Sequence, residues 1–90
     1  MSGFEWDEDK NLANQRKHGI SFEEAATIFE GPVLSLEDDG YHSEVRERSY
    51  GLLGGLVVVC VVHTDREGVI RIISARKATG NERKHFDAYL

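Results

Sequence analysis

Residues 56–62 read Leu56-Val57-Val58-Val59-Cys60-Val61-Val62, and this apolar stretch decides the fold. Branched side chains of this kind pack well on the pleated surface of a sheet. The run is continuous and does not alternate with polar residues, which is typical of a strand that is covered on both faces. We therefore predict that it is the central strand, with helices on one face and the C-terminal segment or a partner protein on the other.

Turn-forming residues divide the rest of the extended sequence. Glycine tolerates the backbone conformations of tight turns, and Asp and Asn favour them. The predicted turns are Asp38-Asp39-Gly40, Gly54-Gly55 and Asp65-Arg66-Glu67-Gly68. The strands expected between them are Val33–Leu36, one beginning near Glu44, the central run, and Val69–Ser74. This order predicts a meander of antiparallel strands.

Capping signals predict three helices. Asp7 suits the N-cap of a helix that runs to about His18 and stops at Gly19. Two Ser/Thr-x-x-Glu capping boxes, Ser21 to Glu24 and Thr79 to Glu82, begin the others. The second helix carries an apolar stripe of Phe22, Ala25, Ala26 and Phe29, and Phe4-Glu5-Trp6 reads as a short edge strand. The predicted class is α+β, with two N-terminal helices and one C-terminal helix on a mainly antiparallel twisted sheet.

Length and composition narrow the class of protein. We expect residues 1–90 to form a single domain that buries little surface and gains stability from a partner. Cys60 is the only cysteine, so no disulfide framework is possible within the chain. The acidic segment Met1–Lys10 lacks the apolar region of a signal peptide, and no stretch is long enough to cross a bilayer. These features predict a cytoplasmic protein with no membrane association.

The charge is unevenly distributed. The formal net charge of −5 weakly opposes a polyanionic partner. Residues 71–85, however, contain five cations and one acid, while acids gather in residues 5–9 and 37–44. The C-terminal third is therefore the part in which anion binding is expected.

Motifs for several kinds of chemistry are missing. His18, His42, His63 and His85 lack the short spacings of a zinc site, so no metal site is predicted. Gly51–Gly55 does not end in Lys-Ser/Thr, which excludes a phosphate-binding loop of that kind. Cys60 should be buried and unreactive. No cofactor is expected.

Arginines within predicted strands are the distinctive feature. Arg46 and Arg48 share one strand face, and Arg71 and Arg76 flank the last strand. Guanidinium groups have forked donors that match phosphate oxygens. On composition alone, ion pairs with Glu5, Glu37, Asp38 or Glu47 explain them as well or better. Because positions 71 and 76 differ by an odd number, either the strand ends before Arg76 or only one of the two belongs to a site.

Four segments together resemble the BrnT family of ribonuclease toxins. They are Phe4-Glu5-Trp6-Asp7 with Asn14 to Ala25, then Glu44-x-Arg46 with Gly51, then Val59 to Thr64, then Arg71 to Ala78 with Glu82-Arg83. The family is similar in fold to the RelE-like toxins, small ribonucleases that cleave without metal. The resemblance implies a BrnT-like toxin whose DNA-binding BrnA-type antitoxin inhibits it, in a complex able to bind operator DNA.

The resemblance also implies roles for particular residues. Metal-free RNA cleavage uses the neighbouring 2′-hydroxyl as nucleophile, so the protein must stabilise an anionic phosphorane and move protons. The expected anion clamp is Arg46, Arg71 and Arg76. Lys17 and Glu44 are expected to supply acid, base or orienting roles that can be exchanged between them, although helix-dipole stabilisation alone also explains Lys17.

Further residues and a second function remain open. The expected RNA-binding residues outside the clamp are Arg48, Lys77, Arg83 and Lys84. His63 has a side-chain pKa range that suits acid or base catalysis, but a hydrogen-bonded structural role is the more common one. The alternative function is a non-catalytic protein that binds its antitoxin and tunes operon repression, which needs an apolar partner surface but no arginines. Dimerisation, directly or through the antitoxin, is also open.

Overall fold

The computed structural model describes residues 3–38 and 44–90, and within them five strands form one sheet in the order β1-β5-β4-β3-β2. The strands are β1 (Phe4–Glu5), β2 (Leu34–Glu37), β3 (Glu47–Leu53), β4 (Val57–Arg66) and β5 (Val69–Lys77). The helices are α1 (Glu8–His18), α2 (Phe22–Ala26), the 3₁₀ turn η1 (Thr27–Glu30) and α3 (Gly80–Tyr89). Only β1 pairs in parallel, with β5. The predicted α+β class and mainly antiparallel sheet are confirmed.

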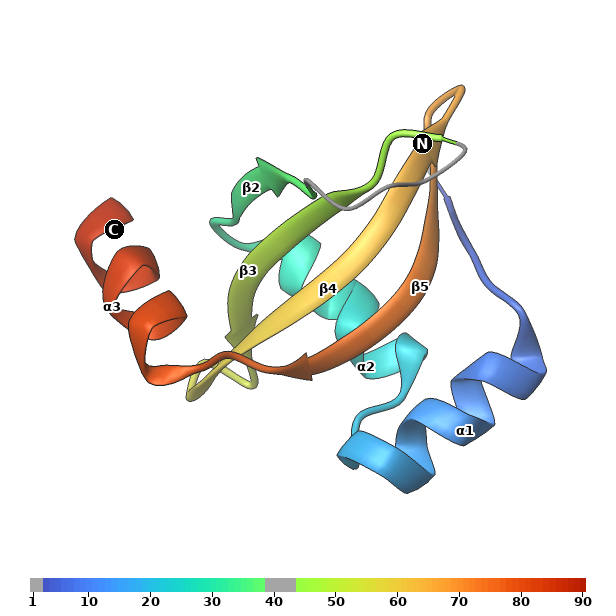
Figure 1. Ribbon diagram of the computed structural model, residues 1–90, viewed down its shortest axis with the longest axis horizontal. Helices are drawn as coiled ribbons and strands as arrows, with labels where there is room; N and C mark the ends of the chain where they lie inside the picture. The colour runs from blue at the N-terminus through green and yellow to red at the C-terminus, as the bar shows by residue number, and fades with distance from the viewer. Residues whose placement is uncertain (1–2, 39–43) are drawn as a thin grey trace.

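Strand β4 lies in the middle of the sheet and is covered on both faces, as the apolar run predicted. Val59 and Val61 belong to a buried cluster with α2, whereas Val58 and Cys60 pack with Phe86 of α3. The twisted sheet therefore has α1 and α2 on one side and α3 on the other (Figure 1). Burial raises the pKa of the Cys60 thiol.

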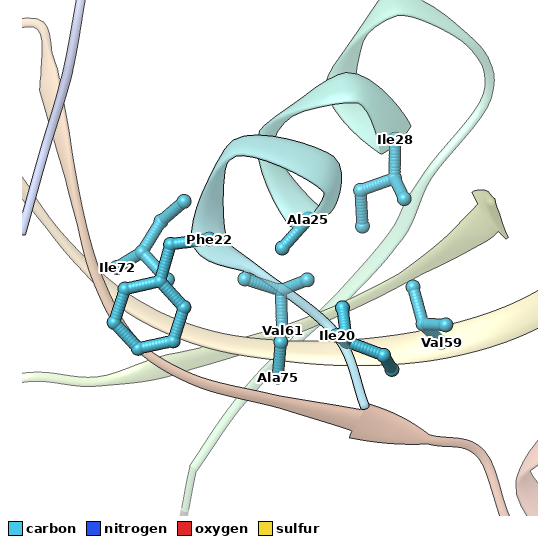
Figure 2. Close-up of a cluster of buried hydrophobic side chains, with 8 residues drawn as sticks. All are labelled: Ile20, Phe22, Ala25, Ile28, Val59, Val61, Ile72 and Ala75. Carbon is cyan, nitrogen blue, oxygen red and sulfur yellow. The ribbon is translucent and has the colours of Figure 1, made fainter. Parts of the chain in front are cut away.

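The main core joins α2 to the sheet (Figure 2). Its members are Ile20, Phe22, Ala25, Ile28, Val59, Val61, Ile72 and Ala75. The predicted stripe included Phe29, but Ile28 is the residue fully buried here, and Phe29 is only partly buried. The reason is the change to a 3₁₀ turn after Ala26, because three residues per turn align Ile28 with Ala25 and Phe22.

The capping predictions are confirmed. Asp7 accepts hydrogen bonds from the first turn of α1, and Gly19 ends that helix in the left-handed conformation. Ser21 and Thr79 each form a complete capping box, with Glu24 and Glu82 as the reciprocal partners.

Some predicted boundaries are wrong. Asp65 and Arg66 belong to β4, and the turn is confined to Glu67 and Gly68, which have positive φ angles of 51° and 84°. β5 continues to Lys77 because its backbone stays paired with β4 up to Val59. The predicted turn residues 39 and 40, with His42, lie outside the described residues. In the described part of the chain, no helix has the length and apolarity to cross a membrane.

Candidate functional site

A β-bulge in β5 determines which arginines lie together. Val62 of β4 lies opposite Ser74, but the next residue, His63, lies opposite Ile72, so Ile73 is an extra residue in β5. The bulge reverses the alternation of side chains between Arg71 and Arg76.

Both arginines consequently face the same side. Arg76 lies opposite Cys60 and Arg71 lies opposite Thr64, and positions 60 and 64 share one face of β4. Of the two alternatives drawn from the sequence, a strand that ends before Arg76 is wrong. The other alternative assumed that the two side chains face opposite sides, and the bulge removes that assumption.

Strand β3 adds two more arginines to this side. Arg48 lies opposite Val62, and Tyr50 lies opposite Cys60. Arg46 directly precedes β3, and its carbonyl accepts a hydrogen bond of 2.8 Å from the backbone of Asp38, which extends the β2–β3 pairing. Alternation then places Arg46 on the side of Arg48. We call this surface the arginine face; it comprises Arg46, Arg48, Arg71 and Arg76, with Tyr50 and Thr64 between them.

Three polar atoms of this face are buried without a hydrogen-bond partner among the described residues: Arg46 Nε, Arg48 Nε and Thr64 Oγ1. Arg48 Nε is 4.0 Å from Asp38 Oδ1, which is an ion pair but too long for a hydrogen bond. Leaving a buried polar group unsatisfied costs about 1–3 kcal/mol. Three such groups therefore gather on the arginine face, on β3 or directly before it and on the adjacent strand β4.

Arg71 has one exchangeable partner. Its Nη1 donates to Glu5 Oε2 of β1 at 3.0 Å, and about a third of its side chain is exposed. Exposed ion pairs of this kind contribute little to stability. Breaking the ion pair between Arg71 and Glu5 therefore costs little.

Arg76 is held much more firmly. Its two Nη atoms donate to Glu82 Oε1 and Oε2 at 2.8 and 3.0 Å. Glu82 also accepts bonds from the Tyr50 hydroxyl at 2.7 Å and the Thr79 backbone at 2.8 Å. The hydrogen bonds from Arg76 are the main reason that the pKa of Glu82 lies far below its usual range, although partial burial acts to raise it. Arg48 joins this network by donating to the Tyr50 hydroxyl at 3.2 Å. The network attaches α3 to the sheet.

Glu44 lies beside the arginine face. Arg66 donates to both of its carboxylate oxygens, with the shortest distance 2.8 Å. The bond to Arg66 lowers the pKa of Glu44, and the charges of Arg46 and Arg71 lower it further. A carboxylate with a lowered pKa is a weaker base, so this environment favours an orienting role. Arg66 was not among the site residues predicted from the sequence, because it was expected in a turn and not at the end of β4.

Lys17 lies elsewhere. Helix α1 packs on the side of the sheet opposite the arginine face, where Asn14 Nδ2 donates to the Ala75 carbonyl at 2.9 Å. Lys17 is exposed in the last turn of that helix. The structure therefore does not bring Lys17 to the arginines.

The four residues expected to bind RNA outside the clamp do not lie on one surface. Arg48 lies on the arginine face, and Arg83 and Lys84 are exposed on α3. Lys77 lies opposite Val59, whose side chain packs on the α2 side, so Lys77 faces away from the arginines.

His63 is a buried, hydrogen-bonded residue on the α2 side. Its Nδ1 is 2.9 Å from Asp65 Oδ1, and its Nε2 is 2.7 Å from the hydroxyl of Ser49. Phe29 packs edge-on against the ring, with centroids 5.3 Å apart. This is the structural role left open by the sequence, on the face away from the arginines.

The fold also places metal-ligating groups together across strands. Ligand atoms of Glu47, His63 and Asp65 lie within 4.8 Å of one another. The spacing rules applied to the sequence could not detect this group, because Glu47 and His63 pair across β3 and β4. Both ring nitrogens of His63 already have partners, so hydrogen bonding accounts for the arrangement.

Comparison with known proteins identifies the family. The family model described as "Ribonuclease toxin, BrnT, of type II toxin-antitoxin system" matches residues 6–82. The chain belongs to the BrnT family. The match confirms the resemblance seen in the sequence. Because toxins of type II systems are paired with an antitoxin, family membership implies an antitoxin partner.

A solved structure of the same family shares the fold. The 1.1 Å crystal structure of the Brucella abortus ribonuclease toxin BrnT matches with a TM-score of 0.66 and 23% identity. The match covers 88% of this chain and 99% of that chain. Comparison with curated proteins gave no match.

Proposed function

We propose that this BrnT-family chain is a metal-independent endoribonuclease toxin that cuts RNA by 2′-hydroxyl attack and arrests growth until a BrnA-like antitoxin neutralises it. The observation that carries the proposal is the arginine face itself. The bulge at Ile73 places Arg71 on the side that Arg46 and Arg48 occupy, beside buried donors without partners. Forked donors arranged in this way suit a phosphate and its phosphorane.

The reaction needs anion stabilisation and proton transfers. The 2′-oxygen loses its proton and bonds to phosphorus, the bond to the 5′-oxygen breaks, and that oxygen takes up a proton from water. Arg46 and Arg71 contact the phosphorane in this proposal, and Arg48 and Thr64 complete the donor set. Glu44 orients the arginines or accepts the 2′-hydroxyl proton. Arg76 acts indirectly, because Glu82 already occupies its donors.

Inhibition by the antitoxin requires that the arginine face be covered. Leu36 of β2 lies opposite Arg48 and is an exposed apolar side chain on this face. A partner segment with apolar and acidic side chains fits this surface. In the complex, the antitoxin supplies the contact with operator DNA, and dimerisation occurs either directly or through the antitoxin.

Cleavage in the presence of EDTA tests the proposal. The purified chain, an Arg46→Ala, Arg71→Ala double variant and an Arg16→Ala control are incubated with a generic RNA. Arg16 lies on the exposed side of α1 and carries the same charge. We expect cleavage by the parent and the control but not by the double variant. If the double variant cuts RNA as fast as the parent, the proposal is wrong.

One observation favours the non-catalytic alternative. Arg71 pairs with Glu5 and Arg48 with Asp38, two of the carboxylates named by the ion-pair interpretation, whereas Arg76 pairs with Glu82, which that interpretation did not name. Under that alternative, the parent cuts no RNA, with or without ribosomes, and antitoxin binding is weakened by substitution of the exposed apolar Leu36 but not by substitution of the arginines.

A further inference from the structure

A pocket of about 330 Å³ adjoins the arginine face where α3 meets β2 and β3. Leu34 and Leu36 of β2 form its apolar wall, and Asn81 and His85 of α3 line the opposite side. The remaining lining residues are Arg48, Tyr50 and Glu82. In Figure 1, α3 turns away from the end of β5 and lies on the side of the sheet that carries β3 and β2.

We propose that this pocket binds a nucleobase of the RNA whose phosphate lies on Arg46 and Arg71. The inference rests on the proposed function and adds to it a site that selects the base. It makes the pocket the specificity-determining part of the molecule, separate from the phosphate contacts.

Continuity with the arginine face supports a nucleotide as the occupant. Arg48 belongs both to the pocket lining and to the arginine face, so the two sites share one side chain. Its Nε is buried and without a hydrogen-bond partner among the described residues. A nucleotide matches this pattern because it joins an anionic phosphate to a flat, largely apolar base. Single-stranded RNA presents such bases unstacked and places them on apolar, aromatic or guanidinium surfaces.

The size of the pocket also favours a base. A volume of about 330 Å³ lies at the lower end of the range for small-molecule sites, roughly 300–1,000 Å³. The apolar wall from Leu34 and Leu36 can hold the flat face of one base. An entire helix of a partner protein would need a longer groove.

Polar groups at the α3 side are available to read the base edge. Glu82 is not available to a base, because its two oxygens already accept hydrogen bonds from Arg76, Tyr50 and the Thr79 backbone. Asn81 and His85 are exposed at the pocket and offer both donors and acceptors. We therefore assign base selection to these two residues.

Binding of mononucleotides, followed by NMR of the full chain, tests the inference. The probes are the four nucleoside 5′-monophosphates and ribose 5-phosphate, which has the same phosphate but no base. We expect all five probes to shift amide signals of Arg46 and Arg71. Only the nucleotides should shift signals of Leu36 and Asn81, and the preferred nucleotide should bind about tenfold more tightly than ribose 5-phosphate.

A pocket-filling variant provides the second arm. Leu36→Trp should remove the tenfold gain and the shifts at Asn81, while ribose 5-phosphate binds as before. Leu12→Trp on α1, where the leucine is similarly exposed, is the matched control and should behave as the parent.

The outcomes separate the two proposals. If the nucleotides shift only the arginine face and bind no better than ribose 5-phosphate, the base pocket is wrong and the phosphate site stands. If no probe shifts the arginine face, the phosphate site of the proposed function is wrong as well. If Leu36→Trp keeps the nucleotide preference but loses antitoxin binding, the pocket belongs to the antitoxin, and our inference is overturned.

Discussion

At the scale of the residue, Arg71 combines a weak internal partner with a place on the arginine face, opposite Thr64. Its bond to Glu5 joins two exposed side chains, so the pair contributes little to stability. Arg76 is the opposite case, since its bidentate bond to Glu82 is part of the attachment of α3. Residue type alone could not separate these two arginines, because their difference comes from partners distant in sequence.

Substitution at Arg71 should therefore affect cleavage and leave folding intact. Losing one contact to the phosphorane costs about 3–4 kcal/mol, so Arg71→Ala should reduce the single-turnover rate roughly a hundredfold or more. Its urea midpoint should stay close to that of the parent. Rates are measured with a labelled RNA at saturating protein.

Glu5→Gln is the matched control. It breaks the same ion pair but keeps the arginine, so cleavage should be equal to or faster than that of the parent. Equal losses in Glu5→Gln and Arg71→Ala would show that the pair itself, and not phosphate binding by Arg71, is what matters.

At the scale of the element, features that depend on neighbouring residues, such as helix caps, could be predicted from the sequence. Features that depend on how strands pair could not. Asp7, Ser21 and Thr79 were predicted as caps and are caps, because capping depends on neighbouring residues only. The bulge at Ile73 could not be predicted, because it depends on how β5 packs against β4 and on the core position of Ile72. The side on which Arg71 lies relative to Arg76 could not be predicted for the same reason, whereas Arg46 and Arg48, two residues apart with no bulge between them, share a face as predicted.

Gly51 shows a close approach between β3 and the turn η1. A Cβ at this position would lie 2.9 Å from Ile28 Cβ and 3.2 Å from a methyl group of Val33. Gly51→Ala should therefore destabilise the protein by about 1–3 kcal/mol, as overpacking does in well-packed cores. Gly31→Ala, with open space around its added methyl group, should change stability little. Urea unfolding of both variants checks this, and similar midpoints for the two would contradict the packing described.

The attachment of α3 should depend on pH through Glu82. The folded state lowers the pKa of this carboxyl from its ordinary value of 4.5, mainly through Arg76. A lowered folded-state pKa contributes stability that is fully present above the unfolded-state pKa and is lost as pH falls below it. The free energy of unfolding of the parent should therefore exceed that of Glu82→Gln at pH 7, and the gap should narrow at pH 3.

Urea titrations at both pH values measure that gap. Glu30→Gln, which removes the same charge from an exposed position in η1, is the control. A gap for Glu82→Gln that is unchanged between pH 7 and pH 3 would mean that the carboxylate does not stabilise α3 through its charge.

At the scale of the whole molecule, the sheet separates two tasks. The side with α1 and α2 holds the main core and buries His63 in hydrogen bonds. The other side carries the arginine face and is only partly covered by α3, which docks through Phe86. The fold class followed from the apolar run and the caps, but only the three-dimensional register revealed which cations share a side. Lys77 lies off the arginine face because it is paired with Val59, which packs on the α2 side. Lys17 lies off it because α1 packs on that same side.

The central claim is that the arginine face binds RNA phosphates, and the salt dependence of affinity tests it most directly. Binding of a non-cleavable single strand is measured over a range of salt concentrations for the parent, Arg46→Ala, Arg71→Ala and Arg16→Ala. Each lost phosphate contact should reduce the slope of log affinity against log salt by about 0.7. We predict this reduction for Arg46→Ala and Arg71→Ala and an unchanged slope for Arg16→Ala. Unchanged slopes for the first two, or an equal reduction for Arg16→Ala, would contradict the account.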